Sequence, residues 1–356
     1  MQELLDFRRF PLWLNLAVAV AAAMGVWAAG TRLTREAEAI SERTGAGQAF
    51  VGLILLGGIV SLPELSTSVT AAAMGNASFA VTTLLGGVSA TMVALAVVDA
   101  LAPHAPVSSD IRRPVILLQG VLTVLFLVVA AAGMTIGGVA VLGVGAWSLA
   151  LLVLYLLFVL LVQRYQWREP WVPSEEARAA LPPRRQRHGG ARPGAPPDRR
   201  PMRRVVLATV VSAALTLATG LLLAVTGDAI ADQTGLGSGF VGLLLGGVAT
   251  SLPEATTFYA AVRLRQYELA FSDAFGTNLF STMAIFFADL AYRGPPILVG
   301  VGSFGVFAIL LGIALTTTYL AGCIERPNLR VLGMGVDSLI VIFTYIGGMI
   351  LLFRLR

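Results

Sequence analysis

The chain has 356 residues, of which 56% are hydrophobic and only 13% are charged, and its mean hydropathy is +0.81. Soluble domains carry roughly 25% charged residues, so this composition excludes an ordinary soluble protein and indicates a chain embedded in lipid. The single cysteine, Cys323, excludes an internal disulfide and a cysteine-based metal cluster, and the two histidines, His104 and His188, both in predicted loops, do not favour a zinc site.

The apolar residues fall into ten runs, each close to the roughly 20 residues that a helix needs to cross a bilayer. No stretch is left over for a sizeable soluble domain, so we expect an all-α polytopic membrane protein. The first run follows the acidic residues Glu3 and Asp6, and we expect it to be retained as a helix rather than cleaved as a signal peptide. The ten runs are 11–30, 48–74, 77–99, 114–132, 137–162, 204–226, 239–262, 269–290, 296–319 and 331–353.

All 25 basic residues are arginines. The net charge of +5 could suggest a nucleic-acid partner, but the placement of the arginines gives a simpler interpretation. With the N-terminus outside, 20 arginines fall in inward-facing connections and 5 in outward-facing ones, as the positive-inside rule expects. We therefore predict an inner-membrane protein with both termini outside, lipids as partners and no nucleic acid.

Residues 164–203 form the one clear linker. They hold eight of the seventeen prolines and, with Arg204, eleven arginines. A segment so poor in apolar residues cannot bury enough surface to order itself, so we predict a flexible cytoplasmic tether. A regulatory or anionic-lipid contact is the alternative. The linker divides the chain into 1–163 and 204–356.

These two halves repeat. A shift of 190 positions places Glu38–Asp99 on Asp228–Asp289 with 21 of 62 positions identical, without a gap. Each half has five apolar runs, an odd number, so tandem copies enter the membrane in opposite senses. Inverted repeats are typical of secondary transporters, and we expect ten transmembrane helices as two inverted five-helix repeats. The same shift pairs Gly143, Gly145 and Tyr155 with Gly333, Gly335 and Tyr345.

The second and seventh runs each contain Ser-Leu-Pro-Glu, at 61–64 and 251–254. Proline inside a helix removes one donor and clashes with the carbonyl four residues earlier, and the upstream glycines Gly57 and Gly247 make unwinding easier. Freed carbonyls cannot face lipid, and they are good ligands for hard cations. We therefore expect helices 2 and 7 to be broken; a simple proline kink is the alternative.

Glu64 and Glu254 lie near the middle of these helices. A charge at the bilayer centre costs roughly 2.5–3.5 kcal/mol on insertion scales, and every arginine is predicted at a loop or helix end. Protons or bound cations must then offset the two charges, and carboxylates that approach each other repel unless a cation lies between them. The alternative is a pair of protonated side chains that donate hydrogen bonds.

Further oxygens follow on the third and eighth helices. Thr91, Thr277 and Ser281, with Asp273 and Asn278, could complete the coordination of Na⁺ or Ca²⁺. A lone membrane serine or threonine, however, more often bonds the backbone of its own helix.

Three further acids lie near helix ends. We expect Asp99 and Asp289 to be cap or interface residues rather than ligands. Asp337 has no counterpart in the first half, where Trp147 stands, and the sequence gives it no role.

The doubled motif resembles the Ca²⁺/cation antiporter superfamily, specifically its sodium/calcium exchanger branch. That family has two inverted five-helix repeats, each with a signature close to Gly-Thr-Ser-Leu-Pro-Glu. The second copy here, Ala249 to Glu254, matches it well, and the first, Ile59 to Glu64, matches more weakly. The resemblance implies that Glu64 and Glu254 bind Ca²⁺. The residues that we expect to hold ions are Glu64, Glu254, Thr250, Ser251, Ser61, Val60, Gly57, Gly247, Thr277, Ser281, Thr91, Asn278 and Asp273.

A second family element, Gly-Asn-x-x-Gly-Ser-Asn-x-x-Asn, has drifted. Its ligand positions are Gly87 and Thr91 in the first copy and Thr277 and Ser281 in the second. Three other positions of the family pattern also differ between the copies. The middle asparagine is Asn278 in the second copy and Val88 in the first, and the leading asparagine is Asp273 in the second and Thr83 in the first. The threonine of the signature is Thr250 in the second copy and Val60, which can offer only its carbonyl, in the first. The resemblance therefore supports cation antiport more firmly than Ca²⁺ as the substrate.

The sequence thus predicts a secondary active antiporter that exchanges Ca²⁺ for Na⁺ by alternating access. An H⁺-coupled or monovalent-cation exchanger of the same fold and a passive cation channel are the alternatives. The transported ions, Ca²⁺ and Na⁺ or H⁺, are the only bound species expected, with no cofactor. Gly333–Asp337 faintly resembles an aspartyl intramembrane protease element, but its spacing is off and no partner acid appears, so no enzyme is expected.

Overall fold

The computed structural model describes residues 7–44, 61–101, 106–141, 143–165, 200–263, 265–325, 329–331 and 333–355. Most of these residues are helical, and short 3₁₀ turns cap several helices. The longer helices are α1 (Leu12–Thr44), α4 (Leu62–Ala73), α5 (Ala77–Asp99), α6 (Pro114–Ile136), α7 (Ala146–Tyr165), α9 (Met202–Thr234), α12 (Leu252–Arg263), α13 (Tyr267–Ala291), α14 (Gly302–Glu325) and α15 (Val336–Leu355). Shorter elements are η2 (Phe7–Arg9), η4 (Val107–Asp110), α10 (Ser238–Val241), the π-helix η5 (Gly242–Gly246), α11 (Gly247–Thr250) and η6 (Ile297–Val301).

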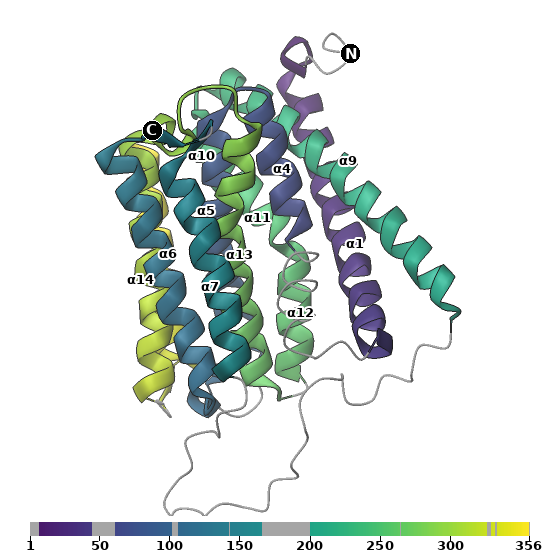
Figure 1. The fold of residues 1–356 in the computed structure, drawn as a ribbon, viewed down its shortest axis with the longest axis vertical. Coiled ribbons are helices and arrows are strands. Elements are labelled where there is room, and N and C mark those ends of the chain that lie inside the picture. Colours follow the sequence, from purple (N-terminus) through teal and green to yellow (C-terminus); the bar gives the residue numbers. More distant parts are fainter. Residues whose placement is uncertain are drawn as a thin grey trace, which may run out of the picture.

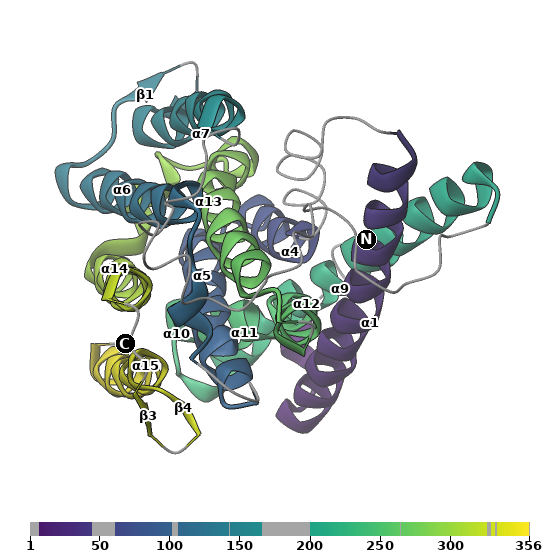
Figure 2. The ribbon, with the colours of Figure 1, turned by 90° about the horizontal axis from the view of Figure 1, so that it is seen from below.

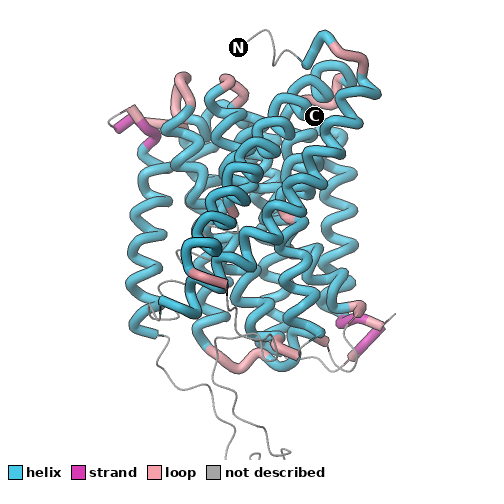
Figure 3. The backbone as a smooth tube through the Cα atoms, turned by 90° about the vertical axis from the view of Figure 1, so that its right-hand side faces the viewer, coloured by secondary structure: helices cyan, strands magenta, loops and turns pink. Residues whose placement is uncertain are grey.

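Among the described residues, seven helices are long and apolar enough to cross a membrane. They are α1, α5, α6, α9, α13, α14 with η6, and α15, and two shorter apolar helices cover 146–161 and 238–250. The protein is therefore a mostly helical, multi-pass membrane protein. Helix α1 begins, and α15 ends, at the same end of the molecule, opposite to the end at which α9 begins (Figures 1 and 3).

Helices α1 and α9 pack against each other and stand beside the main bundle (Figures 1 and 2). Both have 33 residues, longer than the predicted runs 11–30 and 204–226. The predicted runs ended too early because the stretches that complete the helices, 31–44 and 227–234, mix alanine, which favours helix, with charged and polar residues that are not apolar. Helix α9 ends at Gly235, whose φ of 66° suits a left-handed cap.

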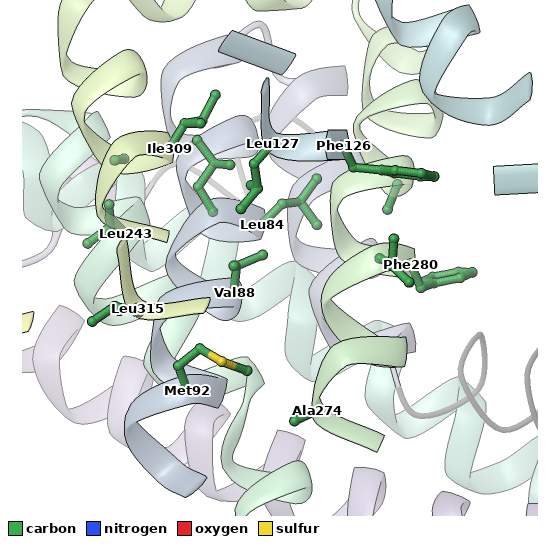
Figure 4. Packing of buried hydrophobic residues seen from close by; sticks show 14 of the residues in the cluster. Leu84, Val88, Met92, Phe126, Leu127, Leu243, Ala274, Phe280, Ile309 and Leu315 are labelled. Carbon is green, nitrogen blue, oxygen red and sulfur yellow. The ribbon is translucent and has the colours of Figure 1, made fainter. Parts of the chain in front are cut away.

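Helices α5 and α13 form the centre of the bundle. They are the most buried of the apolar helices, and both are hydrophobic around most of their circumference, as a helix surrounded by other helices must be. Figure 4 shows Leu84, Val88 and Met92 on α5 packed between side chains of α6, α13 and α14. This packing holds α5 and α13 in place, the two helices that carry Thr91, Thr277 and Ser281.

Two short hairpins lie at opposite ends of the molecule (Figure 3). Strands β1 (Ala140–Val141) and β2 (Val144–Gly145) precede α7, and β3 (Arg330–Val331) and β4 (Met334–Gly335) precede α15. The predicted helices over 137–162 and 331–353 therefore begin too early. Gly143 and Gly333 have φ of 83° and 86°, a left-handed backbone that glycine adopts readily and that turns the chain before each helix.

Asp99 and Asp289 tie these hairpins to the bundle. Asp99 accepts hydrogen bonds from the Val107 and Gly335 N–H groups at 2.8 and 2.7 Å. Asp289 accepts from the Ile297 and Gly145 N–H groups, both at 2.8 Å, and from the Ser148 hydroxyl at 2.5 Å. Each acid thus links the loop that follows its own helix to a hairpin in the other half of the chain. Both acids therefore lie at an interface between the two halves of the chain.

Candidate ion-binding site

Two helices begin inside the bundle. Helix α4 starts at Leu62, and α12 starts at Leu252 after a turn at Ser251 that follows α10, η5 and α11. Figure 1 shows α4 and α12 running from the middle of the bundle toward opposite ends. The predicted break of helix 7 is confirmed at Ser251. In the first half, Gly57 and Val60 lie outside the described residues.

Pro63 and Pro253 are the second residues of α4 and α12. At this position a helix has no partner for the N–H group in any case, so proline fits without loss. The prediction that these prolines interrupt a continuous helix is corrected in this detail: they begin new helices. A glycine of α1, Gly30, packs directly on them, since a Cβ there would lie 2.6 Å from Pro253 Cγ and 3.5 Å from Pro63 Cγ.

Glu64 and Glu254 lie in the first turns of these two helices. Both side chains are completely buried. The unpaired N–H groups at a helix start carry a partial positive charge, which favours a carboxylate there. Neither glutamate forms an ion pair in the part of the chain that the structure describes, so the helix starts are the nearest positive groups on hand.

Glu64 is held by hydroxyl groups from the other half of the chain. The Ser251 hydroxyl donates to Glu64 Oε1 at 3.0 Å, and the Ser281 hydroxyl donates to Glu64 Oε2 through a short hydrogen bond. Gly87 of α5 lies against the same carboxylate, and a Cβ at that position would overlap it. The glycine that replaces a serine of the family element therefore makes room for Glu64.

Glu254 differs from Glu64. Neither of its carboxylate oxygens has a hydrogen-bond partner among the described residues. Ser61 and Thr91, which occupy the positions equivalent to Ser251 and Ser281, are buried but donate no hydrogen bond within the described segments. Thr277 Oγ1 and Asn278 Oδ1 are likewise buried without a partner there. Glu254 and these four side chains thus all have buried oxygens without a hydrogen-bond partner in the described part of the chain.

The other predicted ligands have structural contacts. The Thr250 hydroxyl donates to the Gly246 carbonyl of its own helix at 2.9 Å, and Gly247 packs against the backbone of α5 at Gly86 and Gly87. Asn278 Nδ2 donates to the Val88 carbonyl at 3.3 Å.

Asp273 lies close to Glu254. Its Oδ2 accepts a hydrogen bond at 2.7 Å from the Thr257 hydroxyl, which also donates to the Glu254 carbonyl at 2.8 Å. Sequence reasoning missed Thr257, although its place three residues after Glu254 puts it on the same face of α12. It also missed that the second Ser-x-x-Glu segment, which has the pattern of a capping box, would place Ser251 beside Glu64 of the other half.

The chemistry of this region is that of oxygen ligands. Carboxylate, hydroxyl and carbonyl oxygens are the ligands that hard cations such as Na⁺ and Ca²⁺ prefer. No group of three histidine, cysteine or acidic side chains suited to a metal occurs within the described ranges. An unscreened buried carboxylate is costly in hydrocarbon, so a small cation is the group that this arrangement fits best.

The sodium/calcium exchanger protein family model matches residues 14–163 of the chain. The "Putative antiporter CaxA" of Alkalimonas amylolytica is 27% identical over 350 residues, covering 95% of this chain and 98% of that protein. Among solved structures, the chain resembles YfkE, with a TM-score of 0.65, 13% identity and coverage of 97% and 93% of the two chains.

An H⁺/Ca²⁺ exchanger, CAX, gives a TM-score of 0.63 with 14% identity and coverage of 96% and 85%. The sodium-calcium exchanger NCX_Mj gives 0.55 with 16% identity and coverage of 96% and 99%. At such low identities the solved structures establish the fold alone. The chain is thus similar to sodium/calcium exchanger proteins over residues 14–163, and to an antiporter of another organism over nearly its whole length.

Proposed function

We propose that the chain exchanges Ca²⁺ for Na⁺ by alternating access, with Glu64 and Glu254 as ligands that the two ions share. The observation that carries this proposal is the pair of fully buried glutamates, each in the first turn of a helix that starts inside the bundle. Occupancy by either ion offsets the buried charge. Because both ions need the same carboxylates, release of one permits entry of the other.

We further propose ten transmembrane helices arranged as two inverted five-helix repeats, 1–163 and 204–356, joined by the cytoplasmic linker 164–203. Contacts related by 190 positions support this arrangement. The Asp99–Gly335 hydrogen bond has its counterpart in Asp289–Gly145, and Asn278 contacts its own equivalent position, Val88. The arginine distribution supports an inner-membrane location with both termini outside.

A proton-coupled exchanger of the same fold is the second candidate. Where the second half supplies Thr277 and Asn278, the first half supplies Gly87 and Val88, which have no side-chain oxygen. A thinner ligand set favours fewer bound cations in each cycle, and protonation of the glutamates would release Ca²⁺ without Na⁺. The similarity to an H⁺/Ca²⁺ exchanger structure is compatible with this alternative.

Uptake of radiolabelled Ca²⁺ into proteoliposomes tests both candidates. An outward Na⁺ gradient should drive uptake, and a pH gradient alone should not; the reverse result would favour the proton-coupled exchanger. Glu64→Gln and Glu254→Gln should each reduce uptake to the level of empty liposomes. Glu325→Gln, a change of the same kind at an exposed residue, should leave uptake unchanged. Uptake driven by neither gradient, together with transport of another cation, would show that Ca²⁺ is the wrong substrate.

A further inference from the structure

Asp337, the second residue of α15, is a buried carboxylate that the proposed transport site does not use. It is only 6% exposed. Neither of its oxygens has a partner at full hydrogen-bond geometry among the described residues, although the Ser108 hydroxyl and the N–H groups of Ser338 and Asp337 lie close enough to offset part of its charge. The helix start offers about half of an elementary charge, which offsets only part of a full negative charge. Something else must offset the rest.

Oxygen atoms from three other elements surround this carboxylate. The Ser108 hydroxyl of η4 lies beside it, is 1% exposed, and has no partner within the described segments. Asp99 also lies near Asp337, since both carboxylates lie against Gly335. A Cβ added to Gly335 would touch Asp337 Oδ1 and lie 3.3 Å from Asp99 Oδ2. The titratable groups of α14 on this side are Tyr319 and Cys323. Both acids are buried, and neither forms an ion pair in the described part of the chain.

The opposite end of the molecule provides an internal comparison. There Asp289 makes the same link to a hairpin, and Ser148 donates to it at 2.5 Å. At the Asp99 end the equivalent serine, Ser338, instead pairs with Tyr319 at 3.2 Å. The protein's own hydrogen bonds therefore accommodate a carboxylate such as Asp289. The Asp99 end differs because it holds a second acid, Asp337.

The space for that acid is built into the neighbouring helix. A Cβ at Gly322 of α14 would overlap Asp337 Oδ2 and lie 3.0 Å from its Cγ. In the first half Ala132 stands at the position of Gly322, and Trp147 at that of Asp337. Trp147 in turn lies against the next residue, Gly133. Each half thus has a glycine against which the side chain at this position packs, Gly322 for Asp337 and Gly133 for Trp147.

We propose that Asp337, with Asp99 and Ser108, binds one monovalent cation, Na⁺, at a site separate from Glu64 and Glu254. Oxygen ligands suit a hard cation. One acid more than at the Asp289 end calls for one positive charge, and the Asp99 oxygens are already engaged with two backbone N–H groups, which leaves too few ligands for a divalent ion. The hairpin β3–β4 and the start of α15 lie at the end seen in Figure 2, so the site lies toward the end of the molecule where α9 begins.

Na⁺ binding to the purified full chain, measured by isothermal titration calorimetry with choline as the replacement cation, tests the proposal. The measurement is made in the Glu64→Gln/Glu254→Gln background, so its outcome does not depend on the proposed transport site. We expect one Na⁺ per chain. Asp337→Asn should weaken this binding by at least about tenfold, whereas Asp232→Asn, the same change at an exposed acid, should leave it unchanged.

Two further variants keep the test valid if Asp337→Asn does not fold. Gly322→Ala should displace the carboxylate and weaken Na⁺ binding with all charges kept, and Ser108→Ala should weaken it severalfold. Gly276→Ala, where a Cβ would meet no atom within 4 Å, is the matched control. Absence of Na⁺ binding in the glutamine background at neutral pH would overturn the proposal and indicate a protonated Asp337. Binding that Gly322→Ala and Ser108→Ala leave unchanged would overturn it as well.

Discussion

At the scale of single residues, the two central glutamates are held in different ways. Glu64 accepts hydrogen bonds from Ser251 and Ser281, whereas the equivalent hydroxyls, Ser61 and Thr91, do not donate to Glu254 within the described residues. The described residues therefore satisfy one carboxylate and leave the other without a hydrogen-bond partner. This asymmetry means that a cation would gain most by contacting Glu254, while Glu64 is already oriented by its neighbours.

Ser281→Ala tests the orientation of Glu64. The variant removes a hydrogen bond to a charged group, which is worth about 1.5–3 kcal/mol. Since 1.4 kcal/mol corresponds to a factor of ten in affinity, the apparent Ca²⁺ affinity in the uptake assay should fall about ten- to a hundredfold.

Thr282→Val is the matched control for this prediction. The Thr282 hydroxyl is buried one residue further on and donates to the Asn278 carbonyl of its own helix at 2.8 Å. Its removal should change the apparent affinity by less than about twofold. Equal effects of the two variants would mean that Ser281 acts through packing and not through Glu64.

At the scale of elements, the site depends on helices that approach each other closely. Helix α11 and the π-helix η5 lie directly on α5, so that a Cβ at Gly247 would come to 2.5 Å from the Gly86 Cα. The reverse also holds, because a Cβ at Gly86 would lie 2.8 Å from the Leu243 Cα. Both glycines are needed for this approach, which brings Ser251 within reach of Glu64.

Gly86→Ala should therefore impair both folding and transport. The added methyl group meets backbone, which cannot rotate away, and overpacking of this kind costs about 1–3 kcal/mol. Gly276, at the equivalent position of α13, has open space where its Cβ would lie, so Gly276→Ala serves as control. We expect a lower thermal unfolding midpoint in detergent and weaker Ca²⁺ uptake for Gly86→Ala only. Equal behaviour of the two variants would contradict the close approach.

The carboxylate links at the helix ends lead to a second prediction at this scale. Asp289 accepts three hydrogen bonds, and an asparagine would turn its amide N–H group toward one of those donors. Asp289→Asn should destabilise the protein by about 2–4 kcal/mol. The exposed pair formed by Asp232 and Arg8 is worth about 0–1 kcal/mol, so Asp232→Asn should leave the unfolding midpoint nearly unchanged. A small effect of Asp289→Asn would mean that the hairpin is held mainly by packing.

Hydrophobic patterning and the internal repeat predicted most elements, because long apolar runs have few other stable conformations in lipid. The hairpins before α7 and α15 were missed, since a glycine-rich apolar stretch such as 137–145 has no composition that separates it from a helix. The two glutamates could be predicted from the cost of burial. The hydroxyl groups that donate to Glu64 could not be predicted. Ser251 lies in the other half of the chain, and only three-dimensional packing brings it to this carboxylate.

At the scale of the whole molecule, α1 and α9 form an antiparallel pair that is closed at both ends by charged groups. Arg200, which precedes α9, contacts both oxygens of Glu36 in α1 at 2.9 and 2.8 Å. Arg8, which precedes α1, contacts Asp228 and Asp232 near the end of α9. Gly25 of α1 packs on Thr219 of α9 between them. These contacts make the pair a unit distinct from the bundle that carries the glutamates.

Alternating access requires one part of the protein to move against another around the ion site, and the α1–α9 pair is the part best suited to move. A disulfide within the pair should then be tolerated, whereas one that joins the pair to the bundle should not. A Cβ at Gly25 would lie 3.4 Å from Thr219 Cβ, and one at Gly220 would lie 2.9 Å from Ser66 Cβ on α4. The first distance is close to the roughly 3.5–4.5 Å that disulfides span, and the second is shorter, so that α9 and α4 must separate slightly to accept the bridge.

Both cross-links are made in a Cys323→Ala background, which removes the only native cysteine. After oxidation, Gly25→Cys/Thr219→Cys should retain Na⁺-driven Ca²⁺ uptake, because α1 and α9 keep their mutual positions throughout the cycle. Gly220→Cys/Ser66→Cys should lose uptake on oxidation and regain it on reduction, which separates locking from misfolding. If the cross-link within the pair stops transport and the other does not, α1 and α9 must slide past each other, and the bundle and the pair are not the two moving parts.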